Sequence, residues 1–131
     1  MKRTAMFRWI VFPGVLTGFI LHAFTCFFMA DGGPSGFTVG LFAISILPYL
    51  GCLGVGVRST RGEFMAAYTL PFLLFLDISA FSEAFIYPTT STSPLVLLVV
   101  PVINLAVMVV GFLIGWAAFA ILRRRTSGET L

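Results

Sequence analysis

The stretch Leu73–Phe85 reads LLFLDISAFSEAF and places two carboxylates, Asp77 and Glu83, inside a run of apolar residues. The whole chain of 131 residues holds only five acidic side chains. Extended outward, the run reaches from Phe64 to Ile86. A helix needs roughly 20 apolar residues to cross about 30 Å of hydrocarbon. The sequence therefore predicts a membrane-spanning helix that carries ionisable groups.

The chain as a whole has the composition of an integral membrane protein. Hydrophobic residues make up 59% and charged residues 10%, and the mean hydropathy is +1.05. Soluble domains are about half apolar and about a quarter charged. Lipid offers the backbone no hydrogen-bond partners, so apolar runs of spanning length must form helices. The sequence predicts an all-α polytopic protein, a single membrane domain over 1–131, with spans at about 9–29, 37–57, 64–86 and 94–122.

The basic residues predict the orientation of these spans. In the four-span arrangement all eight fall on one side, namely Lys2, Arg3, Arg8, Arg58, Arg61, Arg123, Arg124 and Arg125. Cytoplasmic loops carry the excess of Lys and Arg, so both termini are expected in the cytoplasm. Short connections place successive helices side by side and in opposite directions. We therefore expect an antiparallel four-transmembrane-helix bundle, multi-pass in the inner (plasma) membrane.

A cleaved signal peptide is the competing interpretation of the first span, because Lys2 and Arg3 precede an apolar segment. That segment is longer than a usual signal core. Phe28 also stands where a cleavage site before Asp31 would need a small residue. We expect the first span to be retained, and its loss would leave three spans with unchanged orientation.

Glycines recur at helical spacing in three of the predicted spans. Those expected to mediate helix packing are Gly14, Gly18, Gly51, Gly111 and Gly115. In lipid, small side chains mark helix contacts because they let two backbones approach closely. We expect these glycines to pack helices within the chain, and contact between two copies is the alternative.

Asp77 is the ionisable residue with the greatest need of a partner, since an Asp at the centre of a membrane helix costs about 2.5–3.5 kcal/mol on the insertion scale. Counted from the cytoplasmic side, His22 follows Trp9 by thirteen residues and Asp77 follows Phe64 by thirteen. Asn104 lies at a similar level in the descending fourth span. We expect His22, Asp77 and Asn104 to form an intramembrane polar cluster. Such a cluster is either a structural hydrogen-bonded contact or a transport or proton-relay site.

A second set of polar residues, Ser79, Ser82 and Glu83, falls within a narrow arc near the outer end of the third span. The arc is expected to be the hydrated end of that helix, and the lining of a shallow outward cavity is the alternative. His22, Cys26 and Met29 share one face of the first span, with the soft ligands that copper or zinc accepts. Three ligands on one helix without a second cluster do not make a metal site, so no metal and no cofactor are expected.

The sequence offers no motif that names a reaction, and short loops leave little room for an enzyme pocket. We expect a non-enzymatic accessory or interaction protein that binds another membrane protein or itself within the lipid bilayer. The alternative is an oligomeric proton-coupled transporter or channel for a small solute or ion that uses Asp77 and His22. A nucleic-acid partner is not expected, because basic residues that follow a membrane helix normally act as its stop signal.

Overall fold

The computed structural model describes residues 5–29, 32–92 and 95–128, and every regular element within those ranges is helical. The elements are η1 (Phe7–Val11), α1 (Phe12–Phe24), η2 (Thr25–Met29), α2 (Gly36–Arg58), α3 (Thr60–Phe81), η3 (Ser82–Ile86) and α4 (Val96–Gly128). The three η segments are short π-helical stretches. η1 and η2 continue α1 at its two ends, and η3 continues α3.

Four helices in the described ranges are long and apolar enough to cross a membrane: Phe7–Met29, Gly36–Arg58, Thr60–Ile86 and Val96–Gly128. The predicted all-α architecture with four apolar spans is confirmed at this level. The helices extend beyond the predicted apolar spans, because the first and third begin before residues 9 and 64 and the fourth continues past residue 122. Polar flanks can add helical turns beyond the hydrocarbon, where hydropathy gives no signal. The predicted start at residue 94 lies outside the described residues.

The turn between α2 and α3 consists of little more than Ser59. The Ser59 hydroxyl accepts a hydrogen bond from the Gly62 amide at 3.0 Å and so caps the start of α3. Gly62 lies directly against the carbonyl oxygen of Val55, and a side chain at this position would overlap that backbone group. The close approach allows α3 to turn back along α2 immediately.

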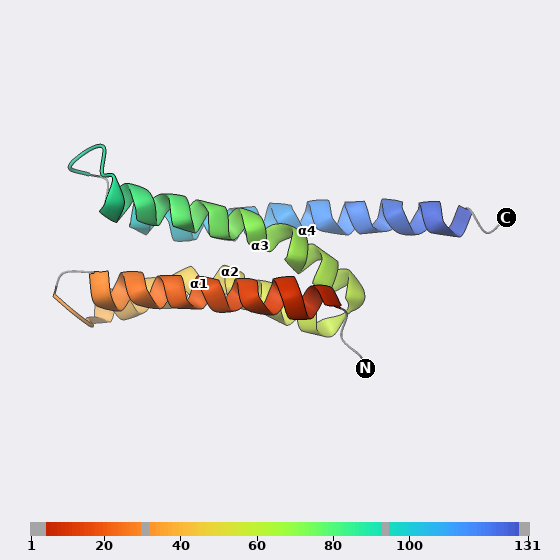
Figure 1. The fold of residues 1–131 in the computed structure, drawn as a ribbon, viewed down its shortest axis with the longest axis horizontal. Coiled ribbons are helices and arrows are strands. Elements are labelled where there is room, and N and C mark those ends of the chain that lie inside the picture. Colours follow the sequence, from red (N-terminus) through yellow and green to blue (C-terminus); the bar gives the residue numbers. More distant parts are fainter. Residues whose placement is uncertain (1–4, 30–31, 93–94, 129–131) are drawn as a thin grey trace.

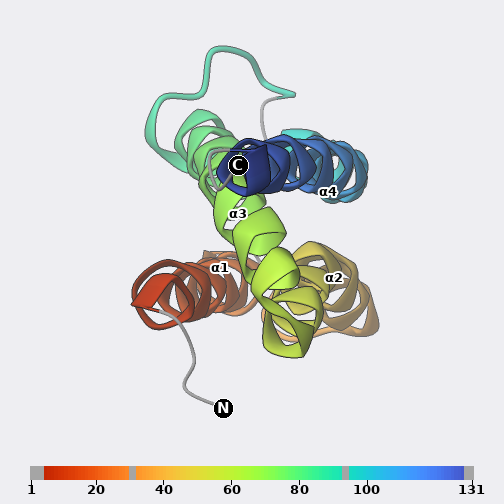
Figure 2. The same cartoon turned by 90° about the vertical axis from the view of Figure 1, so that its right-hand side faces the viewer.

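α3 is the element that joins the two halves of the molecule. Figures 1 and 2 show α1 and α2 side by side in one layer, with α4 in the other. α3 starts beside the first layer and crosses obliquely to pack along α4, so it contacts α1, α2 and α4. α4 has 33 residues, or about 50 Å of helix. Its C-terminal part extends beyond the other helices (Figure 1).

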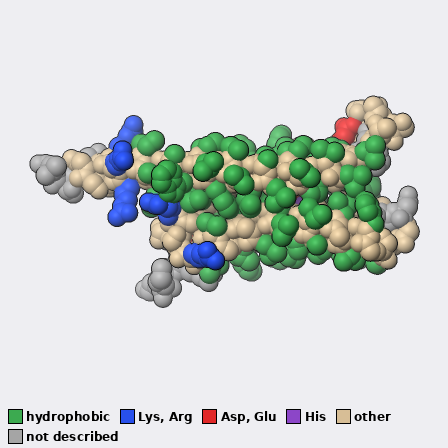
Figure 3. Space-filling view, turned by 180° about the vertical axis from the view of Figure 1, so that it is seen from behind, with side chains coloured by type: hydrophobic (Ala, Val, Ile, Leu, Met, Phe, Trp, Pro, Cys, Tyr) green, Lys and Arg blue, Asp and Glu red, His purple; other side chains and the backbone are tan. Residues whose placement is uncertain are grey.

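Charge separates along the long axis of the molecule. In Figure 1 the N- and C-terminal ends lie at the same end of the molecule as the turn between α2 and α3. Figure 3 shows the Lys and Arg side chains of its visible face gathered at that same end, with a broad apolar surface between it and the opposite end. The described residues that supply this charge are Arg8, Arg58, Arg61, Arg123, Arg124 and Arg125. Lys2 and Arg3 lie outside the described residues.

The five glycines expected to pack helices each lie against a neighbouring helix. A methyl group added to Gly18 would overlap the Tyr49 ring, and one added to Gly51 would lie 2.5 Å from the sulfur of Met108. The corresponding contacts for Gly14, Gly111 and Gly115 are with Leu70 at 3.2 Å, Thr69 at 2.5 Å and Met65 at 3.0 Å. These glycines therefore serve contacts within the chain.

We predict that Gly18→Ala destabilises the fold while Gly40→Ala does not. Both glycines are helical, but a Cβ at Gly40 meets no atom within 4 Å. Overpacking Gly18 against Tyr49 should cost about 1–3 kcal/mol, whereas Gly40→Ala should be neutral or gain about 0.5–1 kcal/mol from helix propensity. Thermal unfolding of the two variants in detergent measures the difference. Equal melting temperatures would contradict the contact.

Candidate functional site

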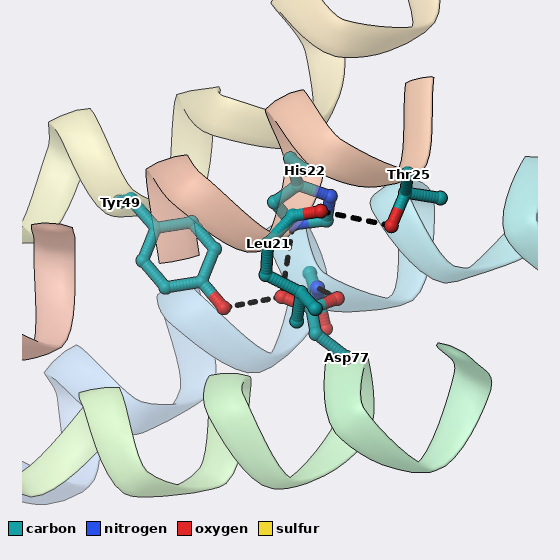
Figure 4. A network of polar contacts seen from close by, with 6 residues as sticks. Leu21, His22, Thr25, Tyr49 and Asp77 are labelled. Carbon is teal, nitrogen blue, oxygen red and sulfur yellow. Dashed lines mark hydrogen bonds and ion pairs between the residues drawn. The ribbon is translucent and has the colours of Figure 1, made fainter. Parts of the chain in front are cut away.

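Each of the four membrane-crossing helices contributes one polar side chain to a single cluster around Asp77. Asp77 lies near the end of α3 and is only 3% exposed. Facing it are His22 from α1, Tyr49 from α2 and Asn104 from α4, all buried. Figure 4 shows the imidazole of His22 and the phenol of Tyr49 both directed at the Asp77 carboxylate. We call these four residues the Asp77 cluster.

Both oxygens of the Asp77 carboxylate have hydrogen-bond partners. His22 Nε2 lies 3.0 Å from Asp77 Oδ2. The Tyr49 hydroxyl donates to the same oxygen. Asn104 Nδ2 donates to Asp77 Oδ1 across 2.6 Å. The carboxylate thus receives from three helices the hydrogen bonds that water would supply outside the membrane.

These contacts account for how a carboxylate survives in an apolar interior. Burying an unpaired charge in a medium of low dielectric constant is far costlier than burying a neutral polar group. A buried pair is tolerated when its remaining lone pairs are also satisfied by hydrogen bonds. At Asp77 the imidazole, the phenol and the amide together meet that condition. Asn104 Oδ1, by contrast, is buried without a hydrogen-bond partner.

The structure brings together the three residues that the sequence placed at one depth. His22 and Asn104 each contact Asp77. The two predicted roles of the cluster, a structural contact or a transport or proton-relay site, stay predictions. Sequence reasoning missed Tyr49, whose hydroxyl completes the set. The available signal was its depth: Tyr49 lies near the middle of α2, where a phenol needs a buried acceptor rather than an interface.

The outer arc of Ser79, Ser82 and Glu83 is not part of the Asp77 cluster. Ser79 is exposed, and Ser82 and Glu83 are partly buried. Glu83 Oε1 accepts hydrogen bonds from the hydroxyl and the backbone N–H of Thr89, at 2.5 and 3.3 Å. This carboxylate therefore connects the end of η3 to the loop that follows, and the assignment of the arc to the hydrated end of the helix stays a prediction.

A small cavity of about 20 Å³ adjoins the Asp77 cluster. Its polar lining comes from His22, Thr25, Ser45 and Asp77, and Cys26 adds a thiol. A cavity must offer about 10–15 Å³ to the centre of a water molecule to hold one, so this space suits a single water and excludes a larger solute. Within the described ranges, no group of three or more His, Cys, Asp or Glu side chains is placed to hold a metal ion.

Comparison with known proteins adds no family to this description. No family model matches the chain, and no curated protein or solved structure matches it either. What the site does must therefore be argued from its own geometry.

We predict that His22 and Asp77 are energetically coupled. In a double-mutant cycle, His22→Leu and Asp77→Leu should each destabilise the protein, and the double variant should lose less than the sum by about 1–3 kcal/mol. The reason is that either single change leaves the other group buried without its partner. Unfolding in mixed micelles at increasing denaturing detergent measures the free energies.

The matched control pairs Asp77→Leu with Thr17→Leu. Thr17 is on the same helix as His22, but it is exposed and its hydroxyl donates to the carbonyl of Pro13. This pair should be additive within about 0.5 kcal/mol. Coupling of equal size in both cycles would show that His22 and Asp77 have no specific interaction.

Proposed function

We propose that this protein is a multi-pass inner-membrane protein that binds and releases a proton at the Asp77–His22 pair, and that it works as a proton-coupled carrier or channel for a small solute or ion. The observation that carries the proposal is the contact of 3.0 Å between a carboxylate and an imidazole from different helices in a membrane-crossing bundle. Ionisable groups inside a membrane are costly, and they commonly mark proton relays and ion pathways. No chemical transformation of a substrate is assigned.

The Asp77–His22 pair is suited to binding and releasing a proton rather than to holding a permanent charge. Imidazole is the side chain whose charge most readily changes near neutral pH. A carboxylate beside it can take up the same proton, so one proton has two acceptors within hydrogen-bonding distance. The surrounding helices exclude bulk water, because all four residues of the Asp77 cluster are buried.

A homo-oligomer is part of this proposal. The cavity at the Asp77 cluster has room for water but not for a solute. A path for anything larger than a proton would then run between copies of the chain. The outward face of α2 supports such contact, since Gly54 has no neighbouring atom within 4 Å of an added Cβ. Small outward residues favour close helix association in lipid.

The second candidate is the accessory or interaction protein expected from the sequence. One observation favours it: the Asp77 cluster takes one side chain from each membrane-crossing helix. Hydrogen bonds that only stabilise the packing of the four helices would have the same arrangement. In this case the exposed small face of α2 binds another membrane protein. The flux experiment below separates the two candidates, because an Asp77 cluster that only stabilises helix packing carries no protons.

We predict that the purified protein in liposomes carries a proton flux that depends on Asp77. With a pH-sensitive dye inside the vesicles, Asp77→Asn should reduce the flux at least tenfold, because an amide cannot take up a proton at neutral pH. Glu83→Gln makes the same chemical change on the same helix at the loop contact with Thr89. It should stay within about twofold of the unchanged protein. Equal flux in both variants would refute the role of Asp77.

The proposal includes an antiparallel arrangement with both termini in the cytoplasm, supported by the basic residues gathered at one end (Figure 3). Reporter fusions at the two termini should both report the cytoplasmic side. An N-terminal tag should also remain on the mature protein, because the first span supplies His22 to the Asp77 cluster. Termini on opposite faces, or loss of the tag, would overturn this topology.

A further inference from the structure

We propose that the Asp77 cluster is open to protons from the outer side of the membrane only, through one water molecule held in the small cavity and a wider vestibule above it. This inference rests on the proposed function and adds to it the direction of access and the identity of the bound group. The outer side is the end of the molecule opposite the basic residues.

The small cavity lies on the outward side of the Asp77–His22 pair. His22 is seven residues before the end of its helix at Met29, or about 10 Å below it at 1.5 Å per residue. The cavity is lined by Thr25 and Cys26, one turn closer to that end, and by Ala80, one turn beyond Asp77 in the same direction. A water in this space would therefore sit between the pair and the outer end of the bundle.

The lining of the cavity can hold such a water. The buried Ser45 hydroxyl can donate to it or accept from it. The Thr25 hydroxyl already donates to the carbonyl of Leu21 at 2.8 Å, so its oxygen remains free to accept. His22 and Asp77 complete the set of polar partners. A buried water normally makes two to four hydrogen bonds, and the cavity offers that number.

A second hollow of about 300 Å³ lies above the first, and we call it the vestibule. It is lined by the outer ends of all four membrane-crossing helices, since its lining residues come from η2, α2, η3 and α4. Four residues line both spaces: Thr25, Cys26, Leu41 and Leu97. The two hollows are therefore neighbours, with Thr25 and Cys26 at the neck between them.

The inner side of the Asp77 cluster is closed by close packing. The Tyr49 ring lies against Gly18, so close that not even a methyl group fits there. Around Tyr49 are the most deeply buried side chains of the core, Val11, Leu70, Leu73 and Cys52, each at most 1% exposed. The titratable groups around Asp77 are then His22 from α1 and Tyr49 from α2, with the amide of Asn104 from α4. Within the described residues, the side of the Asp77 cluster that adjoins a cavity is the outer one, next to Thr25 and Cys26.

The two native cysteines allow a direct test of access. Both are free thiols and both are buried, with Cys26 next to the two hollows and Cys52 in the closely packed inner core. The test uses the full chain in oriented vesicles, with Cys52→Ser to leave only Cys26 and Cys26→Ser to leave only Cys52. A membrane-impermeant methanethiosulfonate added from the outer side should modify Cys26 at least tenfold faster than Cys52, as measured by the mass shift. Equal rates, or faster modification of Cys26 from the cytoplasmic side, would overturn the vestibule.

The water-sized cavity is tested by filling it. Ser45→Val adds bulk to the cavity and removes a hydroxyl from it, whereas Ser79→Val makes the same change at an exposed position of α3. We expect Ser45→Val to reduce the Asp77-dependent proton flux at least tenfold and Ser79→Val to stay within about threefold. Ala80→Val fills the same space from α3 and should match Ser45→Val. Far-UV circular dichroism and the elution volume in detergent should be unchanged in all three variants, which shows that they fold.

The outcomes separate this inference from the proposed function. Proton flux that depends on Asp77 but is insensitive to cavity filling would leave the proton site standing and overturn the access route. Selective modification of Cys26 without any proton flux would support the vestibule as a water-filled hollow and overturn the proton function. Loss of both would overturn both.

Discussion

The fold depends on the requirement that the Asp77 carboxylate be satisfied away from water. A carboxylate has lone pairs on two oxygens, and in an apolar medium each must meet a donor or the charge becomes too costly. Here the donors come from three other helices, His22 and Tyr49 to one oxygen and Asn104 to the other. These simultaneous hydrogen bonds fix the rotation of α1, α2 and α4 about their own axes. A rotation of any one helix by one residue would move its polar side chain out of reach of Asp77.

Helix packing makes this arrangement possible. Lipid provides no hydrophobic drive between helices, so contacts rely on close backbone approach and on hydrogen bonds. The two are linked at Gly18: the absence of a side chain lets the Tyr49 ring lie directly against α1, which brings its hydroxyl to Asp77. On α4, Gly111 and Gly115 bring the helix against Thr69 and Met65 of α3 in the same way. The small-residue contacts thus position the polar groups, and the polar groups select among the possible packings.

The sequence predicted how deep each residue lies along its span. It did not predict which neighbouring helix each residue faces. Hydropathy gave the four spans, and counting residues from the interface brought His22, Asp77 and Asn104 to one level. Sequence reasoning missed Tyr49, because its depth in the span signals the need for a buried acceptor but does not show which neighbouring helix supplies that acceptor. It also did not indicate that α3 crosses between two layers (Figure 2), since Gly111 and Gly115 mark a packing face on α4 without showing which helix lies against it. The helices extend past the predicted spans for a simpler reason: the hydropathy signal ends with the hydrocarbon, whereas the Arg123–Arg125 stretch continues as helix.

The residue types that contact Asp77 favour a cluster that can change its protonation state over one that only stabilises helix packing. A lysine or arginine beside Asp77 would donate in every state, and adding a proton to the carboxylate would then set two donors against each other. Histidine, tyrosine and asparagine can each reverse their role, through a change of tautomer, rotation of the hydroxyl or a flip of the amide. Asn104 already presents a buried oxygen without a partner, so an amide flip would supply an acceptor where a protonated Asp77 would need one. The same four side chains can therefore satisfy both states of the carboxylate, with only small movements inside a packed bundle.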